Sequence, residues 1–182
     1  MAYITRELER KFLKMNGFFK AILVTGARQV GKTTMLKHLA EGTNRTYVSL
    51  DNAMARDLAQ SDPVLFFQTY KPPILIDEVQ KAPELFEQIK IICDETDEKG
   101  LIWLTGSQQY GMMKKVRETL AGRIGILELY SLSQREKNGL VFDVVESIPV
   151  HEDIKLGRGD VDKLLEVYCE NIRRCAKYGV KC

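Results

Sequence analysis

Residues 26–33 have the types and spacing of a loop that binds phosphate. Gly26, Gly31, Lys32 and Thr33 match the pattern G-x-x-x-x-G-K-[ST], after an apolar run and before a helical stretch. Glycines let successive backbone N–H groups turn into one concavity, and the following helix adds its positive dipole end. Lysine at this position reaches the β- and γ-phosphates, and the threonine hydroxyl binds Mg²⁺. The predicted nucleotide contacts are Gly26, Ala27, Arg28, Gln29, Val30, Gly31, Lys32, Thr33 and Thr34.

An acidic pair, Asp77 and Glu78, ends the third apolar run of the chain. Ligands of an open α/β sheet bind beyond the carboxyl ends of its strands, so we expect the pair at the same edge as the loop. Asp77 is predicted to hold Mg²⁺ through water, because this ion keeps much of its hydration shell. Glu78 is predicted to orient or deprotonate an attacking water. The alternative is an acidic residue that merely opens a loop, and the phosphate loop upstream favours the functional interpretation.

Other positions could complete the chemistry. Ser107 or Gln108, after the fourth apolar run, would face the γ-phosphate or the lytic water if that strand lies between the first and third. Arg123 could stabilise transition-state charge, in cis or from a neighbouring subunit, or could be a surface residue after a helix-ending glycine. Arg28 could pair with a phosphate or a carboxylate. The predicted catalytic residues are Lys32, Glu78, Ser107 and Arg123.

The elements that must position these residues alternate along the chain. Strands are predicted over Ala21–Gly26, Thr46–Leu50, Ile74–Asp77, Leu101–Gly106 and Ile124–Tyr130. Helices are predicted over Thr5–Met15, Lys32–Glu41, Asn52–Gln60, Pro63–Thr69, Pro83–Glu95 and Met112–Ala121. Apolar runs without polar alternation are typical of parallel strands buried on both faces, and right-handed crossovers then cover both faces with helices. The predicted fold class is therefore α/β, a three-layer sandwich around a five-stranded parallel sheet.

The pattern weakens after Ser133, which we take as a domain boundary. Residues 134–182 hold one short apolar run and loop-like sequence, followed by a predicted helix over Asp160–Lys177. The basic end of that helix complements its dipole. A nucleic-acid surface is the weaker interpretation, because acidic residues offset the basic ones there.

Composition limits the function classes. A chain of 182 residues with 45% hydrophobic and 29% charged residues can bury one core of ordinary size. The net charge of +2 gives no support for a nucleic-acid partner. The four cysteines form no CxxC pair, so reduced thiols are expected rather than a zinc site. The charged N-terminus and the short apolar runs predict a cytoplasmic protein without a membrane partner.

Taken in order, several segments resemble one family. GARQVGKTTMLKHLA, YVSLD, ILIDEVQKAPEL, LTGSQQ and LAGRIGILELY followed by SLS are similar to the AAA-like P-loop ATPases of bacteria and archaea. The opening YITREL is also similar, and the resemblance covers Tyr3 to Ser133. It implies a P-loop NTPase fold with the sheet order 5-1-4-3-2. It also implies the roles given above for Lys32, Thr33, Asp77 and Glu78, with a sensor near Ser107 and an arginine finger at Arg123.

Two features depart from the family pattern. Ser131 replaces the proline of the family's LYPLS, and the family continues into a larger C-terminal domain where this chain stops. We therefore expect residues 1–133 to be an AAA-like ATPase domain. Residues 134–182 are expected to be a linker and the partial helical start of a missing C-terminal domain in a truncated product.

The function that these observations predict is binding of Mg-ATP and its hydrolysis to ADP and phosphate, with ATP and Mg²⁺ as cofactors. The alternative is a nucleotide-dependent switch with negligible hydrolysis, and Glu78 favours hydrolysis over it. A small-molecule kinase is weaker, because no arginine cluster lies between the third and fifth strands. A homo-oligomer and a protein partner stay open, since an arginine finger in trans would require assembly.

Overall fold

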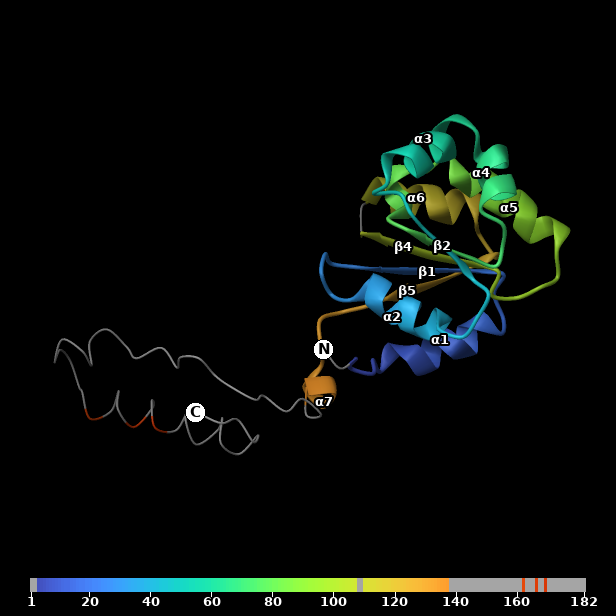
Figure 1. Cartoon of the computed structure of the whole chain (residues 1–182). Coiled ribbons are helices and arrows are strands. Elements are labelled where there is room, and N and C mark those ends of the chain that lie inside the picture. The colour runs from blue at the N-terminus through green and yellow to red at the C-terminus, as the bar shows by residue number, and fades with distance from the viewer. Residues whose placement is uncertain (1–2, 108–109, 138–161, 163–165, 167–168, 170–182) are drawn as a thin grey trace. The chain divides into compact units, whose positions relative to one another are not determined.

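The computed structural model describes residues 3–107 and 110–137 and the single residues 162, 166 and 169. The chain divides into two units, Thr5–Ser133 on one hand and Met1–Ile4 with Gln134–Cys182 on the other. The second unit contributes the short helix α7, Gln134–Lys137. The site residues predicted above all lie in the first unit, which Figure 1 shows as a sheet between two layers of helices.

The sheet of the first unit has five strands, all paired in parallel. They are β1 Ala21–Gly26, β2 Thr46–Ser49, β3 Ile74–Asp77, β4 Ile102–Ser107 and β5 Ile124–Glu128. Their order is β2-β3-β4-β1-β5, so the predicted order 5-1-4-3-2 is confirmed. The register places Gly26 opposite Ser107, and the carboxyl ends of β1, β3 and β4 therefore meet at one edge.

Helices cover both faces of the sheet, because side chains alternate between the faces along each buried strand. Ala21 and Leu23 join the core under α3, α4, α5 and α6, whereas Ile22 and Val24 join the core under α1 and α2. The helices are α1 Leu8–Asn16, α2 Lys32–Ala40, α3 Ala53–Ser61, α4 Pro63–Thr69, α5 Leu85–Glu95 and α6 Tyr110–Thr119, with a 3-10 turn η1 at Val79–Lys81. Both faces of the central strands are thus closed to water.

Local sequence explains where several elements begin. The Asn52 side chain accepts a hydrogen bond from Ala55 N at 3.1 Å and caps α3. The Asp62 side chain accepts one from Leu65 N at 2.9 Å and caps α4, which starts with a proline. The Asp62 cap therefore marks the boundary between α3 and α4, and α4 is followed by β3.

Two predicted helices start later than expected. Helix α1 begins at Leu8 rather than Thr5, and α5 begins at Leu85 rather than Pro83. The 3-10 turn η1 at residues 79–81 precedes α5 and directly follows Glu78. The helix predicted over 160–177 lies outside the described residues except for positions 162, 166 and 169, each of which is helical. In the described part of the chain, no helix combines the length and the apolar composition needed to cross a bilayer.

Candidate nucleotide site

The phosphate loop leaves β1 through backbone that favours glycine. Gly26 has φ +145°, and a Cβ there would lie 2.2 Å from Leu129 O. Gly31, the residue before α2, has φ +93°, and Gln29 between them has φ +61°. Residues with positive φ aim neighbouring N–H groups to the same side, which is the geometry of an anion-binding nest. The loop therefore has the backbone shape that the sequence pattern predicts.

Lys32 starts α2 and is bound to the loop itself. Its side chain is buried, and Nζ donates hydrogen bonds to Gly26 O at 3.1 Å and Ala27 O at 2.7 Å. An ammonium group has three N–H bonds, so these two carbonyls do not use its donor capacity fully. A positive charge is thus fixed next to the nest, where it would meet an anion.

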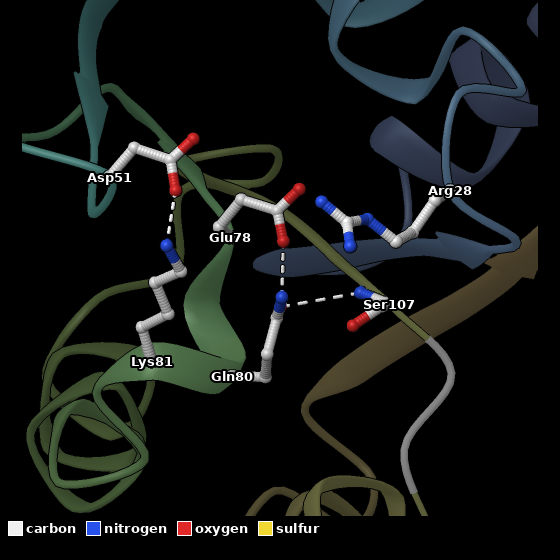
Figure 2. A pocket seen from close by; sticks show the side chains of 6 residues that line it. All are labelled: Arg28, Asp51, Glu78, Gln80, Lys81 and Ser107. Carbon is white, nitrogen blue, oxygen red and sulfur yellow. Dashed lines mark hydrogen bonds and ion pairs between the residues drawn. The ribbon is translucent and has the colours of Figure 1, made fainter.

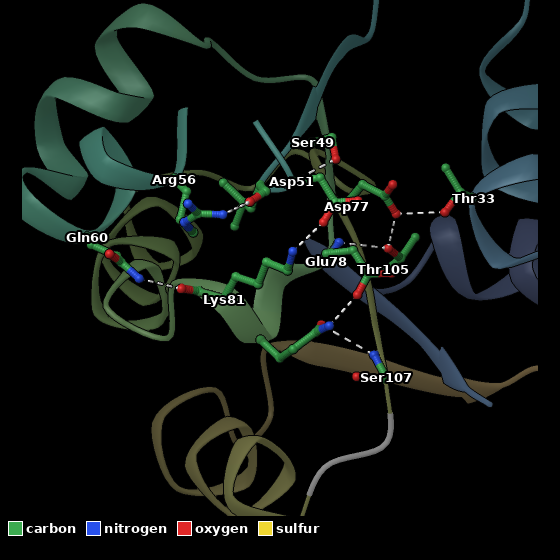
Figure 3. A network of polar contacts seen from close by, with 12 residues as sticks. Thr33, Ser49, Asp51, Arg56, Gln60, Asp77, Glu78, Lys81, Thr105 and Ser107 are labelled. Carbon is green, nitrogen blue, oxygen red and sulfur yellow. Dashed lines mark hydrogen bonds and ion pairs between the residues drawn. The ribbon is translucent and has the colours of Figure 1, made fainter. Parts of the chain in front are cut away.

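Asp77 connects the phosphate loop to the neighbouring strands (Figure 3). Its Oδ1 accepts a hydrogen bond from Thr33 Oγ1 at 2.7 Å and another from Thr105 Oγ1 of β4. Its Oδ2 accepts one from the Tyr47 hydroxyl of β2 at 3.2 Å. Thr105 Oγ1 in turn accepts the backbone N–H of Glu78 at 3.1 Å. The structure therefore joins Thr33, Asp77 and the backbone of Glu78 in one network.

Glu78 lies at the entrance of η1 in the left-handed region, with φ +58°, which is uncommon for a residue with a side chain. Its carboxylate accepts a hydrogen bond from Gln80 Nε2, and Gln80 Oε1 accepts one from Ser107 N at 3.3 Å. Figure 2 shows these side chains around a cavity of about 350 Å³, with the Arg28 guanidinium directed into it. The residues that line it are Arg28, Asp51, Glu78, Gln80, Lys81 and Ser107. The phosphate loop and the tips of β3 and β4 thus share one cavity.

The far rim of this cavity is an ion pair between Lys81 Nζ and Asp51 Oδ1. The carbonyl of Lys81 accepts a hydrogen bond from Gln60 Nε2 of α3 at 2.6 Å. These contacts fasten η1 to α3 and to the segment after β2. The turn that follows Glu78 is therefore bound at Lys81 by two other segments of the chain.

A second cavity, of about 550 Å³, borders the loop next to the end of β5. It is lined by Gly26, Ala27, Val30, Ser107, Glu128, Leu129, Tyr130 and Ser131. The side chain of Tyr130 is exposed there, and a hydrogen bond with Glu128 raises the pKa of its hydroxyl. This cavity has the more apolar walls of the two, because Val30, Leu129 and an aromatic ring contribute to it.

Arg6, upstream of α1, contacts the phosphate loop at Val30, and the sequence analysis did not predict this role. Its side chain is buried, and its two terminal nitrogens donate to Val30 O at 2.8 Å and to Tyr130 O at 2.7 Å. A Cβ on Gly31 would lie 3.4 Å from the first of these nitrogens. A buried arginine needs such acceptors, so Arg6 fixes the loop relative to the chain after β5.

Arg123 is the predicted site residue that the structure does not bring to the others. It directly precedes β5, and its carbonyl accepts a hydrogen bond from Ala21 N at the start of β1, the edge of the sheet opposite the loop. Its guanidinium donates to both carboxylate oxygens of Asp94, at 2.5 and 3.0 Å, and this bond lowers the pKa of Asp94. An arginine finger in cis at Arg123 is therefore wrong, because a residue before a parallel strand lies at its amino end.

Three further residues escaped the sequence interpretation: Tyr47, Thr105 and Gln80. Tyr47 and Thr105 lie on β2 and β4, the two strands next to β3, and both contact Asp77. The predicted strand order could have identified them, because it places both strands beside Asp77. Gln80 follows the acidic pair by two residues, but its second partner, Ser107, lies on another strand. The sequence holds no local signal for that contact.

The oxygen ligands at Asp77 fit magnesium. Within the described ranges, no three His, Cys, Asp or Glu side chains gather as a metal cluster. A cation at Asp77 would take its other ligands from the Thr33 hydroxyl, phosphate oxygens and water, which is the ligand set that Mg²⁺ prefers. Glu78 follows Asp77 in the chain and lines the cavity, where a base could contact a water.

Comparison with known proteins finds two kinds of relative. Uncharacterized proteins of Mycobacterium tuberculosis and Mycobacterium bovis are each 31% identical over 116 residues, which is 63% of this chain and 26% of theirs. The chain thus spans about a quarter of the length of these curated relatives. A family model for D-mannonate dehydratase matches residues 110–182. The mannonate dehydratase of Shouchella clausii is 42% identical over 73 residues, 39% of this chain and 20% of that enzyme.

The fold and the family agree. The Walker-type ATPase of Pyrococcus abyssi matches with a TM-score of 0.53 at 15% identity, over 91% of this chain and 62% of that one. At that identity the likeness shows a common fold. The family model described as an AAA domain matches residues 18–138, which include the phosphate loop, the acidic pair and all five strands. On this match, the chain belongs to the AAA domain family.

Proposed function

We propose that this chain binds Mg-ATP and hydrolyses it to ADP and phosphate. The AAA domain family suggests nucleotide binding and possible hydrolysis. The observation that carries it is the 2.7 Å hydrogen bond between Thr33 Oγ1 and Asp77 Oδ1, with Glu78 next in the chain and facing the same cavity as the loop. Both groups expected to contact magnesium and the group expected to contact water are thus within one network.

Each residue then has one task. The amides of residues 26–34 bind the phosphates, and Lys32 neutralises charge on the β- and γ-phosphates. Thr33 and Asp77 would hold Mg²⁺, which draws electron density from the phosphoryl group when bound. Glu78 orients the attacking water and accepts its proton. Ser107, across from Gly26 in the register, hydrogen-bonds the γ-phosphate or that water.

Each cavity would hold a different part of the substrate. The cavity lined by Glu78 and Arg28 takes the terminal phosphate and the lytic water, because its lining is mostly charged or polar. The cavity beside Tyr130 takes the nucleoside, because Val30 and Leu129 offer the apolar surface that a base requires. Residues 134–182, or a protein partner or a second copy of the chain, would receive the conformational change that hydrolysis drives.

Turnover of Glu78→Gln against wild type at saturating Mg-ATP tests the proposal. We expect Glu78→Gln to lower kcat at least about 100-fold, the size of effect that loss of a general base has. The matched control is Glu118→Gln, which removes an exposed carboxylate of α6. Equal and near-zero rates for wild type and Glu78→Gln, with ATP bound, would support the switch instead of the ATPase.

Nucleotide affinity tests the site independently of turnover. Lys32→Ala should abolish binding of a non-hydrolysable ATP analogue, whereas Lys114→Ala on the exposed face of α6 should leave it unchanged. In wild type, the analogue with Mg²⁺ should raise the temperature of unfolding by mass action. Micromolar ATP binding by Lys32→Ala would refute the assignment of the phosphate loop.

A further inference from the structure

We propose that Gln80 is a positioning residue for catalysis, which orients the Glu78 carboxylate and connects it to the tip of β4 at Ser107. The inference rests on the proposed function, because it gives Gln80 a role only through the group that acts on the water. The proposal is based on two hydrogen bonds within the protein, from Gln80 to Glu78 and from Ser107 to Gln80.

The two hydrogen bonds of Gln80 fix which end of its amide faces which neighbour. Ser107 contributes a backbone N–H, which can only donate, so the amide oxygen must face Ser107. The NH₂ group must then face Glu78, whose Oε2 accepts from it. An ionised carboxylate is acceptor-only, so this arrangement matches the charged form that a base requires.

The backbone around this contact leaves the Gln80 side chain little freedom. A Cβ on Gly106 would lie 3.0 Å from Gln80 Oε1, so the glycine of β4 gives the amide the space to reach Ser107. The positive φ of Glu78 turns its side chain toward the cavity, and Thr105 Oγ1 holds its backbone N–H. Glu78 is thus held at its backbone by one residue of β4 and at its carboxylate by Gln80.

Charged groups also face Glu78, but none makes the contact that Gln80 makes. Arg28 from the loop, Asp51 after β2 and Lys81 from η1 line the same cavity, and Lys81 is paired with Asp51. Among the described residues, Gln80 is the one that hydrogen-bonds the Glu78 carboxylate. The amide is therefore the group whose loss should let the carboxylate turn.

Two substitutions separate the effect of Gln80 on the orientation of Glu78 from the effect of its side-chain shape. Gln80→Met keeps the length of the side chain and removes both hydrogen bonds. Gln80→Glu keeps the shape and the acceptor for Ser107 N, but it sets a carboxylate against Glu78 where a donor stood. Gln68→Glu, on the exposed face of α4, introduces the same charge away from the cavity and is the control.

Steady-state kinetics and binding of a non-hydrolysable ATP analogue then test the role. We expect both Gln80 variants to lose about 10- to 100-fold in kcat, the range that misplacement of a catalytic group produces, while the dissociation constant of the analogue stays within about twofold. Gln68→Glu should match wild type in both. Equal kcat for Gln80→Glu and Gln68→Glu, or a loss of affinity that parallels the loss of kcat, would overturn the proposal.

A double mutant shows whether Gln80 acts through Glu78. If it does, Glu78→Gln with Gln80→Met should have the kcat of Glu78→Gln alone, within about twofold, because nothing is left to orient. Multiplication of the two single effects would overturn the proposal. Independently of turnover, the Gln80 side-chain amide resonances in ¹⁵N spectra should shift on Glu78→Gln far more than those of Gln68. Absent turnover in wild type refutes only the ATPase, whereas an unshifted Gln80 amide refutes this contact.

Discussion

Replacing Arg6 with methionine is expected to weaken both the fold and the nucleotide site. The side chain of Arg6 is 6% exposed and ties Val30 O in the loop to Tyr130 O after β5, at 2.8 and 2.7 Å. Methionine keeps much of the apolar stem and removes the guanidinium. The two carbonyls then lose a charged donor from a site that water does not reach freely.

The size of the loss follows from the bonds removed. A hydrogen bond from a charged donor contributes about 1.5–3 kcal/mol, and the two bonds of one guanidinium are not additive. Arg6→Met should therefore lower the free energy of unfolding by about 2–4 kcal/mol. A domain of this size has about 5–15 kcal/mol in total, so the variant should stay folded at 25 °C. Urea unfolding measures the effect as a lower midpoint with an unchanged slope.

Arg6→Met should also lower the affinity for nucleotide, because Arg6 contacts the phosphate loop. Because Val30 belongs to the phosphate loop, loss of its tether should weaken binding of an ATP analogue about tenfold, which is about 1.4 kcal/mol. Arg10→Met, at an exposed position of α1, is the control, since it removes the same charge without a buried contact. If Arg6→Met equals Arg10→Met in urea midpoint and in analogue affinity, Arg6 does not support the loop.

Four further outcomes are expected. Gly26→Ala should lower the free energy of unfolding by at least about 2 kcal/mol and abolish nucleotide binding, since its Cβ would lie 2.2 Å from a backbone oxygen. The control Gly111→Ala should do neither, because a Cβ at Gly111 would have no heavy atom within 4 Å. Arg123→Gln should leave kcat unchanged at every protein concentration, and a loss of turnover that grows on assembly would reveal a role in trans. Because the hydrogen bond from Arg123 lowers the pKa of Asp94 below its usual value, the stability that the pair contributes is present above that usual value. It is lost as the pH falls through the folded-state pKa, so wild type and Arg123→Gln should converge in acid unfolding. Burial raises the pKa of the Cys93 thiol, so in a variant whose other cysteines are serine, a thiol reagent at pH 8 should react only after unfolding.

The architecture was predictable because each step of the chain leaves a strong local signal. Apolar runs without alternation mark buried parallel strands, and five of them separated by helices restrict the topology to few choices. Gly26, Asp77 and Ser107 each end a strand, so the rule for parallel sheets places them at one edge before any coordinates are known. The same rule applied to Arg123, which precedes a strand, would have excluded it as a finger in cis.

The support of the site was less predictable, because it depends on contacts between distant segments. Arg6 and Tyr130 are 124 positions apart, and a single arginine before a helix resembles any surface cation. Tyr47 lies on the edge strand β2 and is partly exposed, so its role at Asp77 appears only with the register of β2 and β3. Sequence patterns indicate which residues face the ligand more readily than which residues hold them.

The central strands of the sheet connect the two acidic residues. Thr105 of β4 donates to Asp77 and accepts from the Glu78 amide, while Ser107 two residues later contacts Glu78 through Gln80. Because Ser107 also stands opposite Gly26 of the loop, a displacement of the β4 tip by a terminal phosphate would move the partners of both acidic residues at once. The proposed metal contact and the proposed base therefore both depend on β4, and Gln80 is the side chain through which Ser107 is connected to the Glu78 carboxylate.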